Sequence, residues 1–185
     1  MDTDKYNINK GIYPPILDAC CGGRMFYFDK DNPDVLFQDI RKVDTHLCDG
    51  RHFKVNPDII ADFRQMPYPD DTFQMVVFDP PHLFRNVGHS KWADMYGSLN
   101  PKSKPTGYQQ IKYGALGNTD WKDTLTRGFS ECFRVLKPNG VLIFKWNDTD
   151  KPVSEILKLT PYKPLLGNRS GKRSNTHWIV FRKPD

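Results

Sequence analysis

"VVFDPPHLF" at residues 76–84 sets a short apolar run directly before an acid, two prolines and an imidazole. An apolar run this short, without alternation, is typical of a strand that is covered on both faces, as in a parallel sheet. Proline fixes its own backbone angle and offers no N–H donor, so the strand is expected to end at Asp79. Such an end is either a plain rigid turn or the edge of a functional site.

The same arrangement recurs earlier in the chain, where three other apolar runs also end in an acid. The runs "ILD", "VLFQD" and "IIAD" end at Asp18, Asp39 and Asp62, and each is short enough for a buried strand. Sheets of this kind bind ligands outside the carboxyl ends of their strands. Together with Asp79, these acids are therefore expected to line a polar crevice.

The second half of the chain alternates helices with strands. "TDWKDTLTRGFSECFRVLKPNG" (119–140) predicts the best helix, with a cap at Thr119 or Asp120 and a stop at "PNG". A strand over "GVLIFKWND", a short helix over "VSEILKLT" and two strands joined by a basic turn are expected to follow. Interleaved strands and helices predict an α/β, doubly wound sheet. The span 41–57 is expected to be polar and irregular.

Length and composition indicate one folded domain over residues 1–185. The chain is 38% hydrophobic and 13% aromatic, which favours a globule over disorder. No apolar run approaches the roughly 20 residues that span a bilayer, and the first residues do not resemble a signal peptide. These features predict a cytoplasmic protein without a membrane partner.

The four cysteines do not form a disulfide or zinc pattern. They are few and irregularly spaced, and adjacent Cys20 and Cys21 would make a strained bridge. His46, Cys48 and His52 lie close together, but zinc usually needs four ligands and no second pair is evident. A polar loop without a metal is therefore expected there.

Charge is distributed unevenly along the chain, although the net charge is +5. Residues 1–82 carry 9 Lys and Arg against 14 Asp and Glu, a balance of −5, whereas residues 83–118 carry 5 against 1, or +4. From residue 151 to the end the count is 8 against 2, or +6. Two basic stretches after an acidic first half suit a polyanionic partner. A solvated surface on which lysines provide solubility explains them equally well.

The turn after the first predicted strand consists of small residues, "DACCGG" at 18–23. Small side chains let a ligand approach the backbone, but no Gly-Lys-Ser/Thr follows, so this is not a phosphate loop. Asp39 lies 21 positions after Asp18, where an acid can accept both ribose hydroxyls of a nucleoside. The pair favours adenosine-type binding over a tight turn without a ligand.

These segments together resemble a class I S-adenosylmethionine-dependent methyltransferase of the amino-methylating kind, which carries an Asp/Asn-Pro-Pro-aromatic motif. The similar segments are "ILDACCGG", "FQDIR", "ADFRQMPYPDDTFQMVVF" and "FRVLKPNGVLIFKW", and they cover nearly the whole chain. Small proteins of this type resemble phage-type or orphan nucleic-acid methylases. The resemblance implies a mostly parallel, seven-stranded, Rossmann-like sheet with an antiparallel C-terminal hairpin, and S-adenosyl-L-methionine as cofactor.

The resemblance also implies roles for single residues in cofactor binding. Asp18 and the backbone around Cys20 and Gly22 would hold the methionine part of the cofactor. Asp39 would take the ribose hydroxyls. Asp62 would accept from the adenine amino group, and Phe63 would pack on the adenine ring.

The catalytic residues implied by the resemblance are Asp79, Pro80, Pro81 and His82. Asp79 and the carbonyl of Pro80 would accept hydrogen bonds from the target amine, which would turn the nitrogen lone pair toward the methyl donor. The prolines fix the backbone, and His82 would stack on an extruded base. A histidine stacks less strongly than the usual Tyr, Phe or Trp and can protonate near neutral pH, so the target base is less determined than the reaction. The first motif also departs from a fuller glycine-rich form, with Cys20 and Arg24 in place of glycine.

Two basic segments are candidates for contact with nucleic acid. Residues 83–118 form a substrate-facing insertion in which cations alternate with aromatic rings, and the C-terminal turn is rich in arginine and lysine. A lid over the cofactor and a solvated surface are the alternatives. The candidate nucleic-acid-binding residues are Lys91, Trp92, Lys102, Lys104, Tyr108, Arg169, Lys172 and Arg173.

The sequence thus predicts a methyltransferase that modifies an exocyclic amine of a nucleic-acid base, with N6 of adenine in DNA favoured over RNA. Carbon-5 pyrimidine methylation is disfavoured, because that chemistry needs a nucleophilic cysteine and no Pro-Cys occurs in the chain. Methylation of a protein or small-molecule amine stays open, as does cofactor or nucleic-acid binding without catalysis. The sequence does not indicate an oligomeric state.

Overall fold

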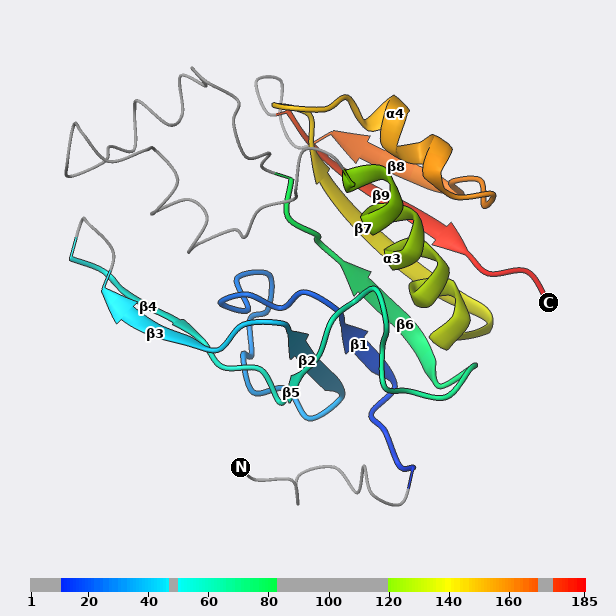
Figure 1. The fold of residues 1–185 in the computed structure, drawn as a ribbon. Coiled ribbons are helices and arrows are strands. Elements are labelled where there is room, and N and C mark those ends of the chain that lie inside the picture. Colours follow the sequence, from blue (N-terminus) through cyan, green and yellow to red (C-terminus); the bar gives the residue numbers. More distant parts are fainter. Residues whose placement is uncertain (1–10, 47–49, 83–119, 170–174) are drawn as a thin grey trace.

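The computed structural model describes residues 11–46, 50–82, 120–169 and 175–185, which form a seven-stranded sheet with helices packed against it (Figure 1). The order of the strands across the sheet is β5-β2-β1-β6-β7-β9-β8. The strands of this sheet are β1 (Ile16–Asp18), β2 (Val35–Asp39), β5 (Ile59–Ile60), β6 (Phe73–Phe78), β7 (Leu136–Asn147), β8 (Leu166–Arg169) and β9 (Thr176–Arg182).

The strand directions agree with the predicted, mostly parallel sheet. The pairs β1–β2, β1–β6, β2–β5 and β6–β7 are parallel, whereas β9 runs antiparallel to both β7 and β8. The central strands are buried on both faces: every residue of β2 is buried, as is most of β6. The expected antiparallel C-terminal pair is therefore confirmed.

Helix α3 (Trp121–Val135) forms the layer over one face of the sheet (Figure 1). Its apolar residues recur at helical spacing, and Leu125, Phe129 and Phe133 are buried. The helix is predicted correctly, but the Asp120 side chain makes no capping hydrogen bond. The helix also ends before the expected stop, at Val135, although Asn139 does adopt the left-handed backbone with φ of 63°.

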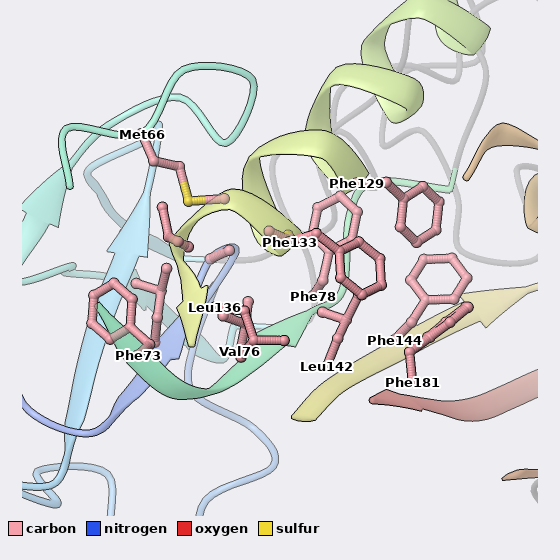
Figure 2. Packing of buried hydrophobic residues seen from close by; sticks show 14 of the residues in the cluster. Met66, Phe73, Val76, Phe78, Phe129, Phe133, Leu136, Leu142, Phe144 and Phe181 are labelled. Atoms are coloured by element: carbon pink, nitrogen blue, oxygen red, sulfur yellow. The ribbon is translucent and has the colours of Figure 1, made fainter. Parts of the chain in front are cut away.

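The core between α3 and the sheet is strongly aromatic (Figure 2). Phe129 of the helix meets Phe78 of β6 at 5.6 Å and Phe144 of β7 at 4.9 Å between ring centroids. Helix α4 (Val153–Ile156) and the 3-10 turn η2 (Leu157–Leu159) add Ile156 to the same core. Such aromatic pairs contribute both buried area and specific geometry.

The opposite face of β1 and β2 is covered by the irregular segment that joins these two strands. Cys21, Val35 and Phe37 form a smaller buried cluster with Tyr27 packed against it. In the described part of the chain, the helices that pack on the main core contact one face, and this segment covers the other. A doubly wound arrangement, with helices on both faces, therefore stays a prediction.

A second, two-stranded sheet lies outside the main one, in a region that was expected to be irregular. Strands β3 (Val43–His46) and β4 (His52–Val55) pair antiparallel between β2 and β5 in the chain. The expectation for residues 41–57 was wrong because polar residues alternate here with apolar ones. Phe53 and Val55 of β4 point to a small core of their own, and such alternation is the sign of a strand covered on one face.

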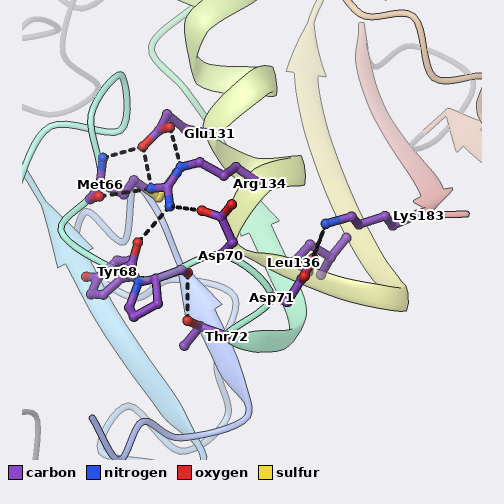
Figure 3. A network of polar contacts seen from close by, with 10 residues as sticks. Met66, Tyr68, Asp70, Asp71, Thr72, Glu131, Arg134, Leu136 and Lys183 are labelled. Atoms are coloured by element: carbon purple, nitrogen blue, oxygen red, sulfur yellow. Dashed lines mark hydrogen bonds and ion pairs between the residues drawn. The ribbon is translucent and has the colours of Figure 1, made fainter. Parts of the chain in front are cut away.

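An arginine on α3 fastens the segment before β6 to the helix (Figure 3). Arg134 donates to the Tyr68 carbonyl at 2.7 Å, to Asp70 at 2.8 Å and to the Met66 carbonyl at 3.0 Å. Glu131 accepts from Arg134 at 2.6 Å and from the Met66 N–H, also at 2.6 Å. These contacts raise the Arg134 pKa, chiefly through the hydrogen bond to Glu131. The guanidinium thereby fixes the path of the chain as it leaves the Asp62 region.

Among the described residues, no helix is both long and apolar enough to cross a membrane.

Candidate active site

Three of the predicted acids gather at one edge of the sheet because their strands are parallel neighbours. Asp18 at the end of β1 lies in register with Phe37 of β2 and Val77 of β6. Asp39 ends β2, and Asp79 directly follows β6. The charges of both acids contribute to raising the Asp18 pKa. The fourth acid, Asp62, lies two residues beyond β5.

Asp18 is fully buried, which is unusual for a carboxylate. Its Oδ1 accepts from the Cys20 N–H at 3.2 Å, whereas its Oδ2 has no hydrogen-bond partner among the described residues. The Tyr27 hydroxyl is near enough to lower the Asp18 pKa, but no hydrogen bond of normal geometry joins the two groups. Burial dominates, and it raises the Asp18 pKa to about 7.

The turn after Asp18 is tied to both neighbouring strands through its backbone. The Ala19 N–H donates to the Val77 carbonyl at 2.9 Å, and the Cys21 N–H donates to the Gln38 carbonyl at 2.8 Å. Gly22 has a positive φ of 48°, a conformation that costs glycine little. The small residues therefore let the backbone cross the sheet edge closely.

Arg24 stands where a fuller glycine-rich motif would have glycine, and the structure gives it a different task. It adopts a positive φ of 55°, and its guanidinium donates to the Lys30 carbonyl at 2.6 Å and to the Asn56 carbonyl at 2.8 Å. It also lies 3.9 Å from the centre of the Phe37 ring. These contacts hold the left-handed backbone in place despite its strain.

The acids of β2 and of the segment after β5 share a local arrangement that sequence reasoning missed. Asp39 accepts from the N–H and the guanidinium of Arg41, and its Oδ2 also accepts from the Gly22 N–H at 3.0 Å. Asp62 accepts in the same way from Arg64, two residues later, at distances down to 2.6 Å. The arginine two positions after each acid is the sequence signal for this pairing.

Phe63, predicted to pack on an adenine ring, is half-buried beside the helix. Its ring meets Phe78 edge to face, with centroids 5.3 Å apart. Gly128 of α3 allows this approach, because a Cβ there would lie only 2.8 Å from both rings. The side of Phe63 that is not packed on the core stays accessible.

The carboxylate of Asp79 faces a lysine that the sequence did not single out. Lys145, on the neighbouring strand β7, donates to Asp79 Oδ2 at 2.9 Å. Burial raises the Asp79 pKa, and the Lys145 charge opposes that rise. A single lysine inside the apolar run "VLIFKW" was the available signal.

His82 differs from the sequence expectation in its charge. Burial, together with the nearby Lys145 charge, lowers the His82 pKa to about 4, so the imidazole is neutral at neutral pH. Its ring lies 6.3 Å from Trp146, edge to face. Pro80 is buried and Pro81 is partly buried beside it. The expectation that His82 protonates near neutral pH was therefore wrong, because its surroundings oppose a second positive charge.

The cysteines and histidines do not form a reactive or metal-binding group in the described residues. Cys20, Cys21 and Cys132 are free thiols whose pKa values are raised by burial. His52 hydrogen-bonds to Asp44 at 2.6 Å, and no cluster of three or more metal-ligating side chains occurs there.

The candidate nucleic-acid residues are mostly beyond the described part of the chain. Arg169, on β8, is described, and its guanidinium donates to the Asn175 side chain at 2.8 Å. The residues that lie outside the described ranges are Lys91, Trp92, Lys102, Lys104, Tyr108, Lys172 and Arg173.

No protein-family model matches the sequence, and no curated protein matches it. Among solved structures, the chain is similar to the N-methyltransferase NodS from Bradyrhizobium japonicum, with a TM-score of 0.51 and 11% identity over 96% of this chain and 90% of that one. It is also similar to the PH0226 protein from Pyrococcus horikoshii, with a TM-score of 0.50 and 16% identity over 91% and 81% of the two chains.

The fold is that of a class I methyltransferase. A third similar structure, the 1,6-didemethyltoxoflavin-N1-methyltransferase of Burkholderia thailandensis, was solved with S-adenosylhomocysteine bound. It has a TM-score of 0.46 and 11% identity over 99% of this chain and 76% of that one.

In this methyltransferase fold the strand order reverses between β1 and β6. From β1 the chain builds outward through β2 to β5, and it then returns to place β6 on the other side of β1. Open α/β sheets bind ligands in the crevice at such a switch point, outside the carboxyl ends of the strands. Asp18 ends β1 and Asp79 directly follows β6, so these two acids lie at the switch point.

Proposed function

We propose that the protein is an S-adenosylmethionine-dependent methyltransferase that modifies an exocyclic amine of a nucleic-acid base. The observation that carries the proposal is the position of Asp18 and Asp79 at the switch point of a methyltransferase fold. The first of these carboxylates is buried and has one oxygen without a hydrogen-bond partner among the described residues, and the second begins the Asp-Pro-Pro-His segment.

The residues at the edge of the sheet fit the cofactor. Asp18 Oδ2, for which the described part of the chain provides no hydrogen-bond partner, suits the ammonium group of the methionine part, because a buried acceptor gains most from a charged donor. The half-buried ring of Phe63 suits an adenine face. Asp39 and Asp62 suit the ribose hydroxyls and the adenine amino group, and in these roles they would exchange contacts with Arg41 and Arg64 for contacts with the ligand.

When bound, the cofactor supplies a methyl group on a positively charged sulfur. The chain's own task is then to make a poor nucleophile reactive, since the lone pair of an aromatic amine is delocalised into its ring. Asp79 and the Pro80 carbonyl would accept the two amine hydrogens and favour a tetrahedral nitrogen. Asp79 would also take up the surplus proton of the methylated amine and release it to water.

The proposed substrate is adenine in DNA, methylated at N6, with RNA as the next candidate. The support is the charge pattern: residues 83–118 and 151–185 carry balances of +4 and +6, which suit a polyanion. About six phosphate contacts would make binding to a single-stranded oligonucleotide fall roughly a thousandfold between 50 and 200 mM salt. Affinity that does not change with salt would contradict a nucleic-acid substrate.

The direct test is transfer of tritium from labelled cofactor to separate pools of DNA, RNA and protein. We expect counts in DNA, and we expect Asp79→Ala to abolish transfer while cofactor affinity stays nearly unchanged. Asp71→Ala is the matched control, because Asp71 forms an ion pair of similar length, with Lys183 at 2.7 Å. Cofactor binding without transfer to any pool would overturn the proposal.

A further inference from the structure

Lys145 lies beside Asp79, the carboxylate that is proposed to bind the target amine. It projects from β7 on the face opposite the buried Phe144 and Trp146, and its Nζ lies 2.9 Å from Asp79 Oδ2. The two side chains keep 21% and 20% of their surface exposed, so neither is sealed in the core. Both side chains are therefore partly accessible to solvent.

Two aromatic rings flank the same ammonium group. The Lys145 Nζ lies 4.6 Å from the centre of the Phe26 ring and 5.8 Å from that of Trp178. These rings contact each other edge to face at 5.1 Å, and Trp178 pairs with Lys145 across β7 and β9. Phe26 belongs to the turn segment after β1 and is exposed. An acid, a cation and two rings from four segments thus meet beside the proposed reaction centre.

This combination has the chemistry of one edge of an aminated heterocycle. An ammonium group carries three N–H donors, and in the described part of the chain one of them is used, on Asp79. A base that carries an amine next to a ring nitrogen offers a donor and an acceptor side by side, as adenine and cytosine do. A carboxylate and an ammonium group match that pattern one to one, and flat rings suit the faces of the base.

We propose that Lys145 determines substrate specificity by donating a hydrogen bond to the ring nitrogen next to the target amine, while Asp79 accepts a hydrogen bond from that amine. Phe26 and Trp178 would pack against the heterocycle. This inference rests on the proposed function and narrows its substrate class to amines conjugated to a ring nitrogen. The Lys145 charge would repel a protonated aliphatic amine, such as a protein lysine. It therefore disfavours the protein substrate that the sequence left open.

The simpler role for Lys145 is to hold Asp79 in place, and substrate analogues separate the two roles. The substrates are two single-stranded DNA oligonucleotides, one with a single adenine and one with 1-deazaadenine, which has C–H at the ring position beside the amine. Lys145→Met, Lys145→Arg and wild type are compared by kcat/KM on both. Lys183→Met is the control, since Lys183 is exposed to a similar degree, 18%, and also pairs with an aspartate.

We expect wild type to prefer adenine over 1-deazaadenine by about tenfold or more, as for loss of a hydrogen bond to a charged donor. Lys145→Met should lower this preference about tenfold relative to wild type, as for loss of that hydrogen bond, whereas Lys145→Arg should keep part of the preference and Lys183→Met all of it. The amine of 1-deazaadenine differs from that of adenine in intrinsic reactivity. This difference cancels when the ratio of the two kcat/KM values is compared between wild type and each variant. A purely positioning lysine would slow both substrates equally and leave the ratio unchanged, which would overturn the inference. Wild-type transfer to neither oligonucleotide nor any other heterocyclic amine would overturn the proposed function as well.

Discussion

Replacing Asp18 with asparagine removes a charge from the protein interior and leaves the shape of the side chain nearly unchanged. Asp18 Oδ1 accepts from the Cys20 N–H, and an amide oxygen can do the same. Oδ2 has no partner among the described residues, so the amide NH₂ that replaces it breaks no described hydrogen bond. The main consequence of Asp18→Asn is therefore electrostatic.

The sign of the effect follows from the direction of the pKa shift. Burial raises the Asp18 pKa from 3.8 to about 7, so between these values the folded state binds a proton that the unfolded state has lost. The Asp18 contribution to stability consequently falls as pH rises from 3.8 to 7, by about 1.4 kcal/mol per pH unit and about 4 kcal/mol in total. Asparagine has no such dependence. The variant should gain on wild type over this range and keep a constant advantage above pH 7.

Urea unfolding, followed by circular dichroism between pH 4 and pH 8.5, measures this difference directly. The subtraction cancels titrations common to both proteins, including that of His82. Asp34→Asn is the control, because it makes the same chemical change at an exposed position. The same carboxylate is proposed to bind the ammonium group of the cofactor, so calorimetry at pH 7.5 should show weaker cofactor binding by Asp18→Asn. A flat stability difference between pH 4 and pH 7, or a wild type more stable at pH 8, would refute the reasoning.

Two substitutions and one titration test the surroundings of the site. Gly128→Ala should destabilise the fold by about 1–3 kcal/mol in thermal unfolding, although alanine favours helices, because the new Cβ meets Phe63 and Phe78 at 2.8 Å; an unchanged melting temperature would mean that the rings move aside freely. Arg134→Met should cost about 2 kcal/mol in urea unfolding, since its donors hold the segment before β6 to α3, and Arg134→Lys should recover only part of it. His82 should titrate near pH 4 by NMR, so its contribution to stability is complete above pH 6.5 and is lost as pH falls toward 4; titration near 6.5 would contradict the burial argument.

Strands β1, β2 and β6 at the centre of the main sheet could be predicted from the sequence because each is a short apolar run that ends at an acid or directly before one. Burial on both faces removes the alternation of apolar and polar residues, and such a short continuous apolar run is typical of a strand in a parallel sheet. The β3–β4 hairpin was missed because its apolar residues are few: one face of the hairpin rests on Phe53 and Val55, and the other is solvated. Alternation over only four residues is a weak signal against a polar background.

Within the candidate site, the positions of the acids could be predicted, but the lysine that contacts Asp79 could not. Each acid follows from its own strand, whereas Lys145 reaches Asp79 only because β6 and β7 pair in parallel with Val77 opposite Ile143. That register depends on long-range packing and cannot be predicted from the sequence of β6 or of β7 alone. The neutral state of His82 also depends on distant parts of the chain, since burial is the main cause of its low pKa and the Lys145 charge adds to it. Roles that depend on pairing between distant strands thus need the structure.

The three carboxylates at this edge of the sheet, Asp18, Asp39 and Asp79, differ in how their charge is compensated. Asp39 has Arg41 and a backbone N–H, and Asp79 has Lys145, but no cation pairs with Asp18 among the described residues. A buried carboxylate without a cation costs stability as soon as it ionises, and here it does so near neutral pH. A ligand that brings its own positive charge removes that cost, so binding should strengthen as pH rises toward 7. The acidic edge therefore favours a cationic ligand at Asp18 rather than a neutral nucleoside, as expected for the methionine end of S-adenosylmethionine.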